Sequence, residues 1–131
     1  MPDRKHALVV DEAVLALAFQ EFFESQGLRV STASGEAEAV GLLTTVPFDV
    51  VITDLMLPKG NGMDLIAEIR RNGDFPPIIV ITSDDGAVHE LIRVNNIQIL
   101  HKPAAVTDLL DALDTVLQTP SPYRLEVAGT G

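Results

Sequence analysis

The sequence contains no cysteine, so disulfide bonds, thiolate chemistry and cysteine-ligated zinc sites are excluded. Basic residues are scarce: nine lysines and arginines stand against nineteen acidic residues, for a formal net charge of −10 and an isoelectric point near 4.5. That balance argues against a nucleic-acid surface and against docking on an anionic membrane, because both need a basic face. No apolar run approaches the ~18 residues of a membrane-spanning helix, and the N-terminal apolar stretch is too short for a signal peptide.

The remaining composition is typical of one folded domain. Of the 131 residues, 47% are apolar and 21% are charged, which provides for a core and excludes a disordered acidic tail. We expect a single domain over residues 1–118. Residues 119–131 hold two prolines and two glycines without a helical period, so we expect a flexible tail or the start of a linker there. The expected location is the cytoplasm, because no targeting signal is recognisable.

Short apolar runs alternate with segments of helical period along the chain. The runs predict five strands, at residues 7–10, 28–33, 48–54, 78–82 and 97–100. A helical spacing of apolar residues follows each run, and the last of these segments covers residues 107–117. Uninterrupted apolar strands are typical of strands buried on both faces. The sequence therefore predicts an α/β fold of the (βα)5 type, a doubly wound parallel sheet of five strands with helices on both faces.

The sequence also allows predictions about helix starts and helix interiors. Asp11 or Glu12 is expected to cap the first helix, Ser34 the second, and Asp84 or Asp85 the fourth. Gly41 falls in the middle of the second helix, where it either weakens the helix or marks close packing.

Polar side chains follow four of the predicted strands. Asp11 and Glu12 follow the first strand, Asp54 the third, Thr82 the fourth and Lys102 the fifth. Ligands of open parallel sheets bind beyond the carboxyl ends of the strands, so these groups should meet at one edge. Three neighbouring carboxylates stay ionised only beside a cation, and hard oxygen ligands with open positions suit Mg²⁺. A carboxylate held beside Mg²⁺ and a lysine can attack phosphorus and become an acyl phosphate.

Four motifs in this order resemble the receiver domains of bacterial two-component response regulators, the CheY-like superfamily. They are VVDE (residues 9–12), ITDLMLPKGNG (52–62), IVITSD (79–84) and HKP (101–103), and the similarity covers roughly residues 5–117. Each motif lies at a strand end, and within the second a proline and a glycine follow Asp54 by four and eight residues. The resemblance implies the flavodoxin-like strand order 2-1-3-4-5.

The resemblance also implies a role for each candidate site residue. Asp54 would be the phosphoacceptor, Thr82 the switch hydroxyl and Lys102 the ammonium that pairs with phosphate. Mg²⁺ would be bound by the side chains of Asp11, Glu12 and Asp54 and by the backbone carbonyl of Met56. The bond between Lys102 and the next proline would be cis. Expected partners are a histidine kinase or histidine phosphotransfer protein, and a downstream protein target or output domain.

The sequence departs from the family pattern at three points. Ile99 occupies the position where the family has a switch aromatic, so a rotating aromatic side chain cannot report phosphorylation here. The second residue of the acidic pair is Glu12, where relatives usually have aspartate. The segment from Thr82 to Lys102 is about half a turn short, which predicts a trimmed or irregular fourth helix.

Three classes of function compete. The first is a phosphoacceptor switch of a phosphorelay, phosphorylated on Asp54 and not a turnover enzyme; a homodimer through the fourth helix, fifth strand and last helix is possible by family habit. The second is a receiver-like interaction module that works without phosphorylation, an alternative motivated by Ile99 and by the altered acidic loop. The third is an enzyme or flavin carrier on a similar sheet. A dehalogenase-type phosphatase needs an aspartate where Met56 stands, and carboxylates after the first strand would repel a flavin phosphate.

Overall fold

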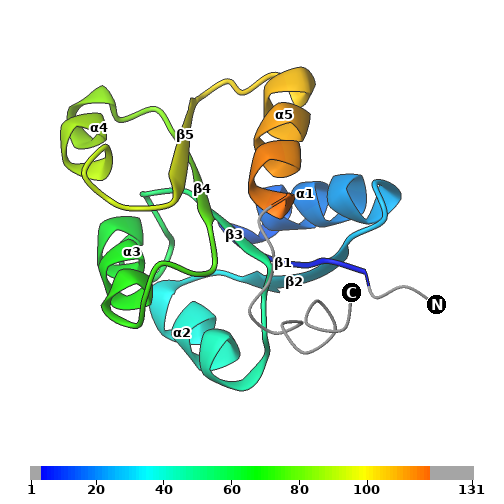
Figure 1. Ribbon diagram of the computed structural model, residues 1–131, viewed down its shortest axis with the longest axis horizontal. Helices are drawn as coiled ribbons and strands as arrows, with labels where there is room; N and C mark the ends of the chain where they lie inside the picture. The colour runs from blue at the N-terminus through cyan, green and yellow to red at the C-terminus, as the bar shows by residue number, and fades with distance from the viewer. Residues whose placement is uncertain (1–3, 119–131) are drawn as a thin grey trace.

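All five strands lie parallel in one sheet (Figure 1). The computed structural model describes residues 4–118. The strand order is β2-β1-β3-β4-β5, which confirms the predicted topology. The strands are β1 (His6–Val10), β2 (Arg29–Ala33), β3 (Val50–Thr53), β4 (Ile78–Thr82) and β5 (Ile97–His101).

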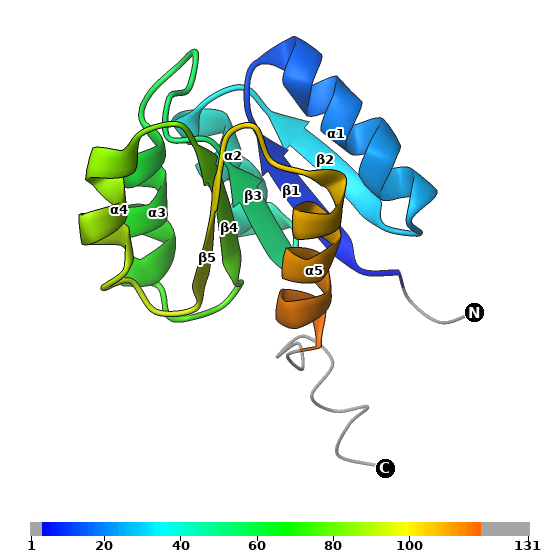
Figure 2. The ribbon, with the colours of Figure 1, turned by 90° about the horizontal axis from the view of Figure 1, so that it is seen from above.

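The helices cover both faces of the sheet, as predicted. They are α1 (Ala13–Ser25), α2 (Glu36–Thr45), α3 (Gly62–Arg71), α4 (Asp85–Leu91) and α5 (Val106–Leu117). Helices α1 and α5 pack on one face, and α2, α3 and α4 lie on the other (Figure 2). At seven residues α4 is the shortest of them, which agrees with the expected trimming of this segment.

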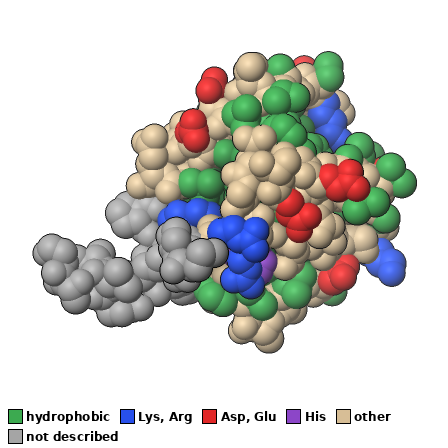
Figure 3. Space-filling view, turned by 90° about the vertical axis from the view of Figure 1, so that its right-hand side faces the viewer, with side chains coloured by type: hydrophobic (Ala, Val, Ile, Leu, Met, Phe, Trp, Pro, Cys, Tyr) green, Lys and Arg blue, Asp and Glu red, His purple; other side chains and the backbone are tan. Residues whose placement is uncertain are grey.

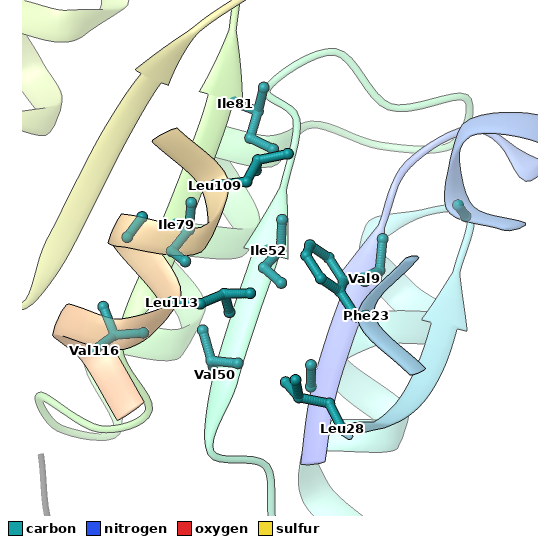
Figure 4. Close-up of a cluster of buried hydrophobic side chains, with 13 residues drawn as sticks. Val9, Phe23, Leu28, Val50, Ile52, Ile79, Ile81, Leu109, Leu113 and Val116 are labelled. Carbon is teal, nitrogen blue, oxygen red and sulfur yellow. The ribbon is translucent and has the colours of Figure 1, made fainter. Parts of the chain in front are cut away.

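The central strands alternate their side chains between two hydrophobic clusters. Every residue of β1, β3 and β4 is buried, which explains why their sequences read as unbroken apolar runs. On one face, Phe23 of α1 and Leu113 of α5 pack against the sheet (Figure 4). On the other, Leu65 and Leu91 fill the space above the alternate strand residues. The two clusters fix the strand register, and so the relative positions of the strand ends.

The predicted side-chain caps of α1 and α2 are wrong, because neither helix has a side chain that bonds to its first N–H groups. Gly35 is the N-cap of α2, and the N–H of Ser34 donates to Glu38 Oε1 at 2.9 Å instead. Glu12 is the N-cap of α1, whose side chain makes no capping bond, while Asp11 accepts the N–H of Glu12 at 2.8 Å. The predicted cap of α4 is confirmed: Asp84 Oδ1 accepts the N–H groups of Gly86 and Ala87.

Gly41 does not mark close packing. A Cβ atom built on it meets nothing within 4 Å in the described part of the chain, so this glycine only weakens α2. The predicted tail, residues 119–131, lies outside the described residues. Within residues 4–118, no helix is long and apolar enough to cross a membrane.

Candidate functional site

The carboxyl ends of β1 and β3 place Asp11 and Asp54 next to each other. Val10 and Thr53 are the last residues of their strands and pair in the sheet, and each is directly followed by one of the two aspartates. The N–H of Asp54 donates to the carbonyl of Val10 at 3.3 Å, which continues the sheet up to the acidic residue. Both aspartates are buried, with 4% and 8% of their surface exposed, so two carboxylates share one sparsely hydrated position.

The carboxylate of Asp54 is held at both oxygens. Its Oδ1 accepts the backbone N–H groups of Leu55 at 2.6 Å and of Met56 at 3.2 Å. Its Oδ2 lies 2.5 Å from the Nζ atom of Lys102, which comes from the end of β5. Backbone donors and an ammonium thus contact opposite oxygens of this carboxylate. The side chain is therefore held in one orientation beside a cation, an arrangement that suits a nucleophilic carboxylate.

Burial raises the pKa of Asp11, because water is excluded from this carboxylate. The N–H of Glu12 and the Lys102 ammonium oppose that shift, whereas the negative charges of Asp54 and Glu12 add to it. A buried carboxylate beside another carboxylate is under electrostatic strain that a divalent cation relieves. Two carboxylates are a suitable set of oxygen ligands for Mg²⁺, because this ion is usually bound by one or two carboxylates and keeps several waters.

The structure does not gather a third carboxylate. Residues 4–118 contain no group of three or more His, Cys, Asp or Glu side chains placed to hold a metal ion. Glu12 is exposed, and its backbone is used by α1, since its carbonyl accepts the N–H of Ala16. Met56 has a side chain that is 77% exposed and a backbone that lies directly beside Asp54. Metal binding by Glu12 and by the Met56 carbonyl stays a prediction.

Thr82 ends β4 at the same edge of the sheet. Thr82 is only 1% exposed, and its Oγ1 accepts the N–H of Asp84 at 3.0 Å. The carbonyl of Thr82 accepts the N–H of Lys102, so the ends of β4 and β5 are tied together. The Lys102–Pro103 bond is cis, as the resemblance implied. The site thus joins an anion, a cation and a hydroxyl from three neighbouring strands.

The glycine eight residues after Asp54 is required by close backbone packing. A Cβ atom on Gly62 would lie 2.3 Å from the carbonyl oxygen of Asp54 and 2.6 Å from Leu55 Cα. The N–H of Gly62 donates to the carbonyl of Leu55 at 2.9 Å, which closes the β3–α3 loop. The spacing in the ITDLMLPKGNG motif therefore reflects a loop that folds back onto the acidic residue.

Sequence reasoning missed two contacts around α4. The Nδ1 atom of His101 lies 2.9 Å from Asp85 Oδ1, and the Arg70 guanidinium donates to the carbonyls of Asn95 and Asn96. The partners are 16 to 26 residues apart and share no local pattern. Only the pairing of β4 with β5 could have pointed to the first contact, since it brings His101 opposite Thr82.

Comparisons with known proteins agree with this geometry. The family profile described as the response regulator receiver domain matches residues 7–114. The alginate biosynthesis transcriptional regulatory protein AlgB of Pseudomonas aeruginosa is 30% identical over 105 residues, which are 78% of this chain and 23% of that protein. The probable transcriptional regulator ycf29 of Pyropia yezoensis is 38% identical over 59% of this chain and 35% of its own length. The chain thus spans about a third or less of these relatives.

Solved structures of receiver domains and response regulators share the fold of this chain. The non-phosphorylated HemR receiver domain of Leptospira biflexa superposes with a TM-score of 0.80 at 29% identity, over 91% of this chain and 98% of that one. The response regulator TrrA of Thermotoga maritima, solved in complex with Mg²⁺ and BeF, shares the fold with a TM-score of 0.78 at 23% identity, over 86% and 99% of the two chains. With the topology, the strand-end residues and the matched profile in agreement, this chain belongs to the response regulator receiver domain family.

Proposed function

We propose that this receiver domain is a phosphoacceptor switch that takes a phosphoryl group from a phosphohistidine onto Asp54 in the cytoplasm. The observation that carries the proposal is the contact of Asp54 with Lys102 at 2.5 Å, beside the buried carboxylate of Asp11. The donor would be a histidine kinase or a histidine phosphotransfer protein. The output is a change in affinity for a downstream protein or an attached output domain.

The chain's own groups perform most of the transfer. A carboxylate oxygen of Asp54 forms the new P–O bond while the P–N bond to the donor imidazole breaks, and the imidazole keeps the bonding electron pair. The N–H groups of Leu55 and Met56 fix the plane of the carboxylate, so little reorientation precedes attack. The ammonium of Lys102 neutralises charge on the transferring oxygens, and the hydroxyl of Thr82 donates to one of them once the group is in place.

Asp11, Asp54 and the Met56 carbonyl would hold Mg²⁺. When bound, Mg²⁺ supplies positive charge to the phosphoryl oxygens. In TrrA the same fold accommodates Mg²⁺ with BeF, which supports this cofactor here. The domain carries one phosphoryl group and is not a turnover enzyme on a free substrate.

The exposed face of α1 suits the phosphodonor. Val14 is 73% exposed and Leu17 is 55% exposed, and both lie close in sequence to Asp11. Hydrophobic side chains reach the surface on this side of the molecule (Figure 3). An apolar helix face next to the acceptor would position a phosphohistidine borne on a helix of the donor. A homodimer through α4, β5 and α5 remains a second expectation for this chain; Ile92, 65% exposed, would contribute to it.

Phosphorylation with a small donor tests the proposal directly. The purified chain is incubated with Mg²⁺ and acetyl phosphate, and intact-mass spectrometry is expected to show the gain of one phosphoryl group. Asp54→Asn should abolish the gain, because an amide oxygen is a poor nucleophile. The control variant Asp114→Asn makes the same change at an exposed position of α5 and should leave the gain unchanged. A wild-type chain that gains no mass and binds no beryllium fluoride would refute the proposal.

The alternative is a receiver-like interaction module that needs no phosphate. It is favoured by Ile99, which is half-buried against the second hydrophobic cluster and has no aromatic ring to rotate. Partner binding that is unchanged by Asp54→Asn and by chelation of Mg²⁺ would support this alternative.

A further inference from the structure

Helix α4 is held to the domain by few apolar contacts. Of its seven residues only Leu91 is buried, while Ala87 and Val88 are half-buried and the others are exposed. An element with so little buried apolar surface can move at low free-energy cost. Its position therefore depends on the polar contacts at its two ends.

The first end of α4 is tied to the phosphorylation site. The N–H of Asp84 donates to Thr82 Oγ1, and the carboxylate of Asp84 caps the helix. The next residue, Asp85, lies 2.9 Å from His101 Nδ1. His101 is paired with Thr82 in the sheet and directly precedes Lys102. We refer to the Asp85–His101 contact as the latch, because it joins the first turn of α4 to the end of β5.

The turn between α4 and β5, which follows the second end of α4, is tied to α3, away from the site. The Nε atom of Arg70 donates to the Asn95 carbonyl at 2.7 Å, and its Nη2 atom donates to the Asn96 carbonyl at 2.9 Å. Asn96 has a φ of +59°, a conformation that asparagine tolerates, and its side chain donates to the Asp74 carbonyl at 2.7 Å. None of these groups belongs to the phosphorylation site.

We propose that the Asp85–His101 latch holds the resting position of α4, and that phosphorylation releases the latched end while the Arg70 end stays fixed. This inference rests on the proposed function. The hydroxyl of Thr82 accepts the Asp84 N–H in the resting structure. When Thr82 turns to the phosphoryl group, that N–H loses its partner and the first turn of α4 must shift. The latch opposes this shift in the resting state, so the shift must break it. Because the contacts of Arg70 with the turn after α4 stay in place, α4 then pivots about that turn. No aromatic switch residue is needed.

Breaking the latch is therefore expected to favour the phosphoryl-bound state. Asp85→Asn and His101→Gln should each bind beryllium fluoride, with Mg²⁺ present, about two- to five-fold more tightly than wild type, the range expected for a polar contact between exposed side chains. Only one of the two variants removes a negative charge. Asp85→Asn removes a carboxylate and would by itself favour an anion, whereas His101→Gln removes no negative charge, so tighter binding by both cannot come from the lost carboxylate alone.

Hydrogen–deuterium exchange gives a second measurement. In the ligand-free variants, the amides of Gly86 and Ala87 should exchange faster than in wild type. In wild type, binding of beryllium fluoride, the mimic of the phosphoryl group, should change the exchange of these amides. The exchange of the Asn95 and Asn96 amides should stay unchanged. His89→Gln, a substitution at an exposed histidine of the same helix, is the matched control and should bind the mimic as wild type does.

The outcomes separate the latch from the proposed function. Wild-type binding of the mimic with unchanged or weaker binding by His101→Gln would overturn the latch and leave the phosphoacceptor role intact. Exchange that changes equally at both ends of α4 would overturn the pivot. A wild-type chain that binds no mimic would overturn the proposed function, and the coupling would fall with it.

Discussion

Replacing Gly62 by alanine should destabilise the domain strongly, because the added methyl group meets backbone on both sides. The Cβ atom would lie 2.3 Å from the Asp54 carbonyl oxygen, whereas ordinary van der Waals contact begins at 3.4 Å. The β3–α3 loop must therefore move away by about 1 Å, and the bond from the Gly62 N–H to the Leu55 carbonyl moves with it. Overpacking against atoms that cannot rotate away costs about 3 kcal/mol, the upper part of the usual range.

The same substitution at Gly41 provides the matched control. This glycine lies inside α2, with open space where a Cβ would stand among the described residues. Alanine there should stabilise the domain by about 0.5–1 kcal/mol, because it restricts the unfolded chain and favours the helix. In urea, with an m-value of about 2 kcal/mol/M, the midpoints of Gly41→Ala and Gly62→Ala should differ by about 2 M. Equal midpoints, or a more stable Gly62→Ala, would refute this account of the loop.

Three further predictions concern metal, pH and the anchored end of α4. Mg²⁺ at ten times its dissociation constant should stabilise the fold by about 1.4 kcal/mol and raise the melting temperature by about 5 °C in calorimetry; a rise that persists in Asp11→Asn would contradict the site. Burial lowers the pKa of His6, and the nearby Arg29 charge adds to this effect while Asp49 opposes it. The folded state thus binds a proton less readily, so the urea midpoint should fall as pH drops below about 6.5, and His6→Gln should lose this dependence. Arg70→Ala should lower the free energy of unfolding by about 1 kcal/mol, measured by the same titration, with a matched loss of amide protection in the α4–β5 turn.

The strands were predictable because β1, β3 and β4 are buried on both faces. Burial on both faces demands apolar residues at every position, and that demand is visible in a single sequence. The meeting of Asp11, Asp54 and Lys102 followed from the same reasoning, since parallel strands end at one edge. The predicted roles of Thr82 and Glu12 depend on side-chain orientation, which strand periodicity does not specify.

Helix caps and tertiary side-chain contacts were less predictable. Ser34 has the residue type of a good cap, yet Glu38 reaches back to its N–H and the backbone of Gly35 takes the capping position. Propensity gives only an average over many surroundings, and a neighbouring carboxylate decides the individual case. The contact of His101 with Asp85 depends on strand pairing across sixteen residues of sequence, so no local pattern contains it.

Under the proposed function, the charges at the site predict that Lys102 alone is insufficient for phosphoryl transfer. Asp11, Asp54 and Lys102 together give −1 − 1 + 1 = −1, so the resting site repels an anionic donor. Between unit charges 4 Å apart, this repulsion is about 4 kcal/mol at an effective dielectric constant near 20. A divalent cation changes the sum to +1, which attracts the donor. Once Asp54 becomes an acyl phosphate of charge about −2, the sum is −1 − 2 + 1 + 2 = 0. We therefore expect Mg²⁺ to serve both in attracting the donor and in retaining the product, and phosphorylation should be lost on chelation even though Lys102 is in place.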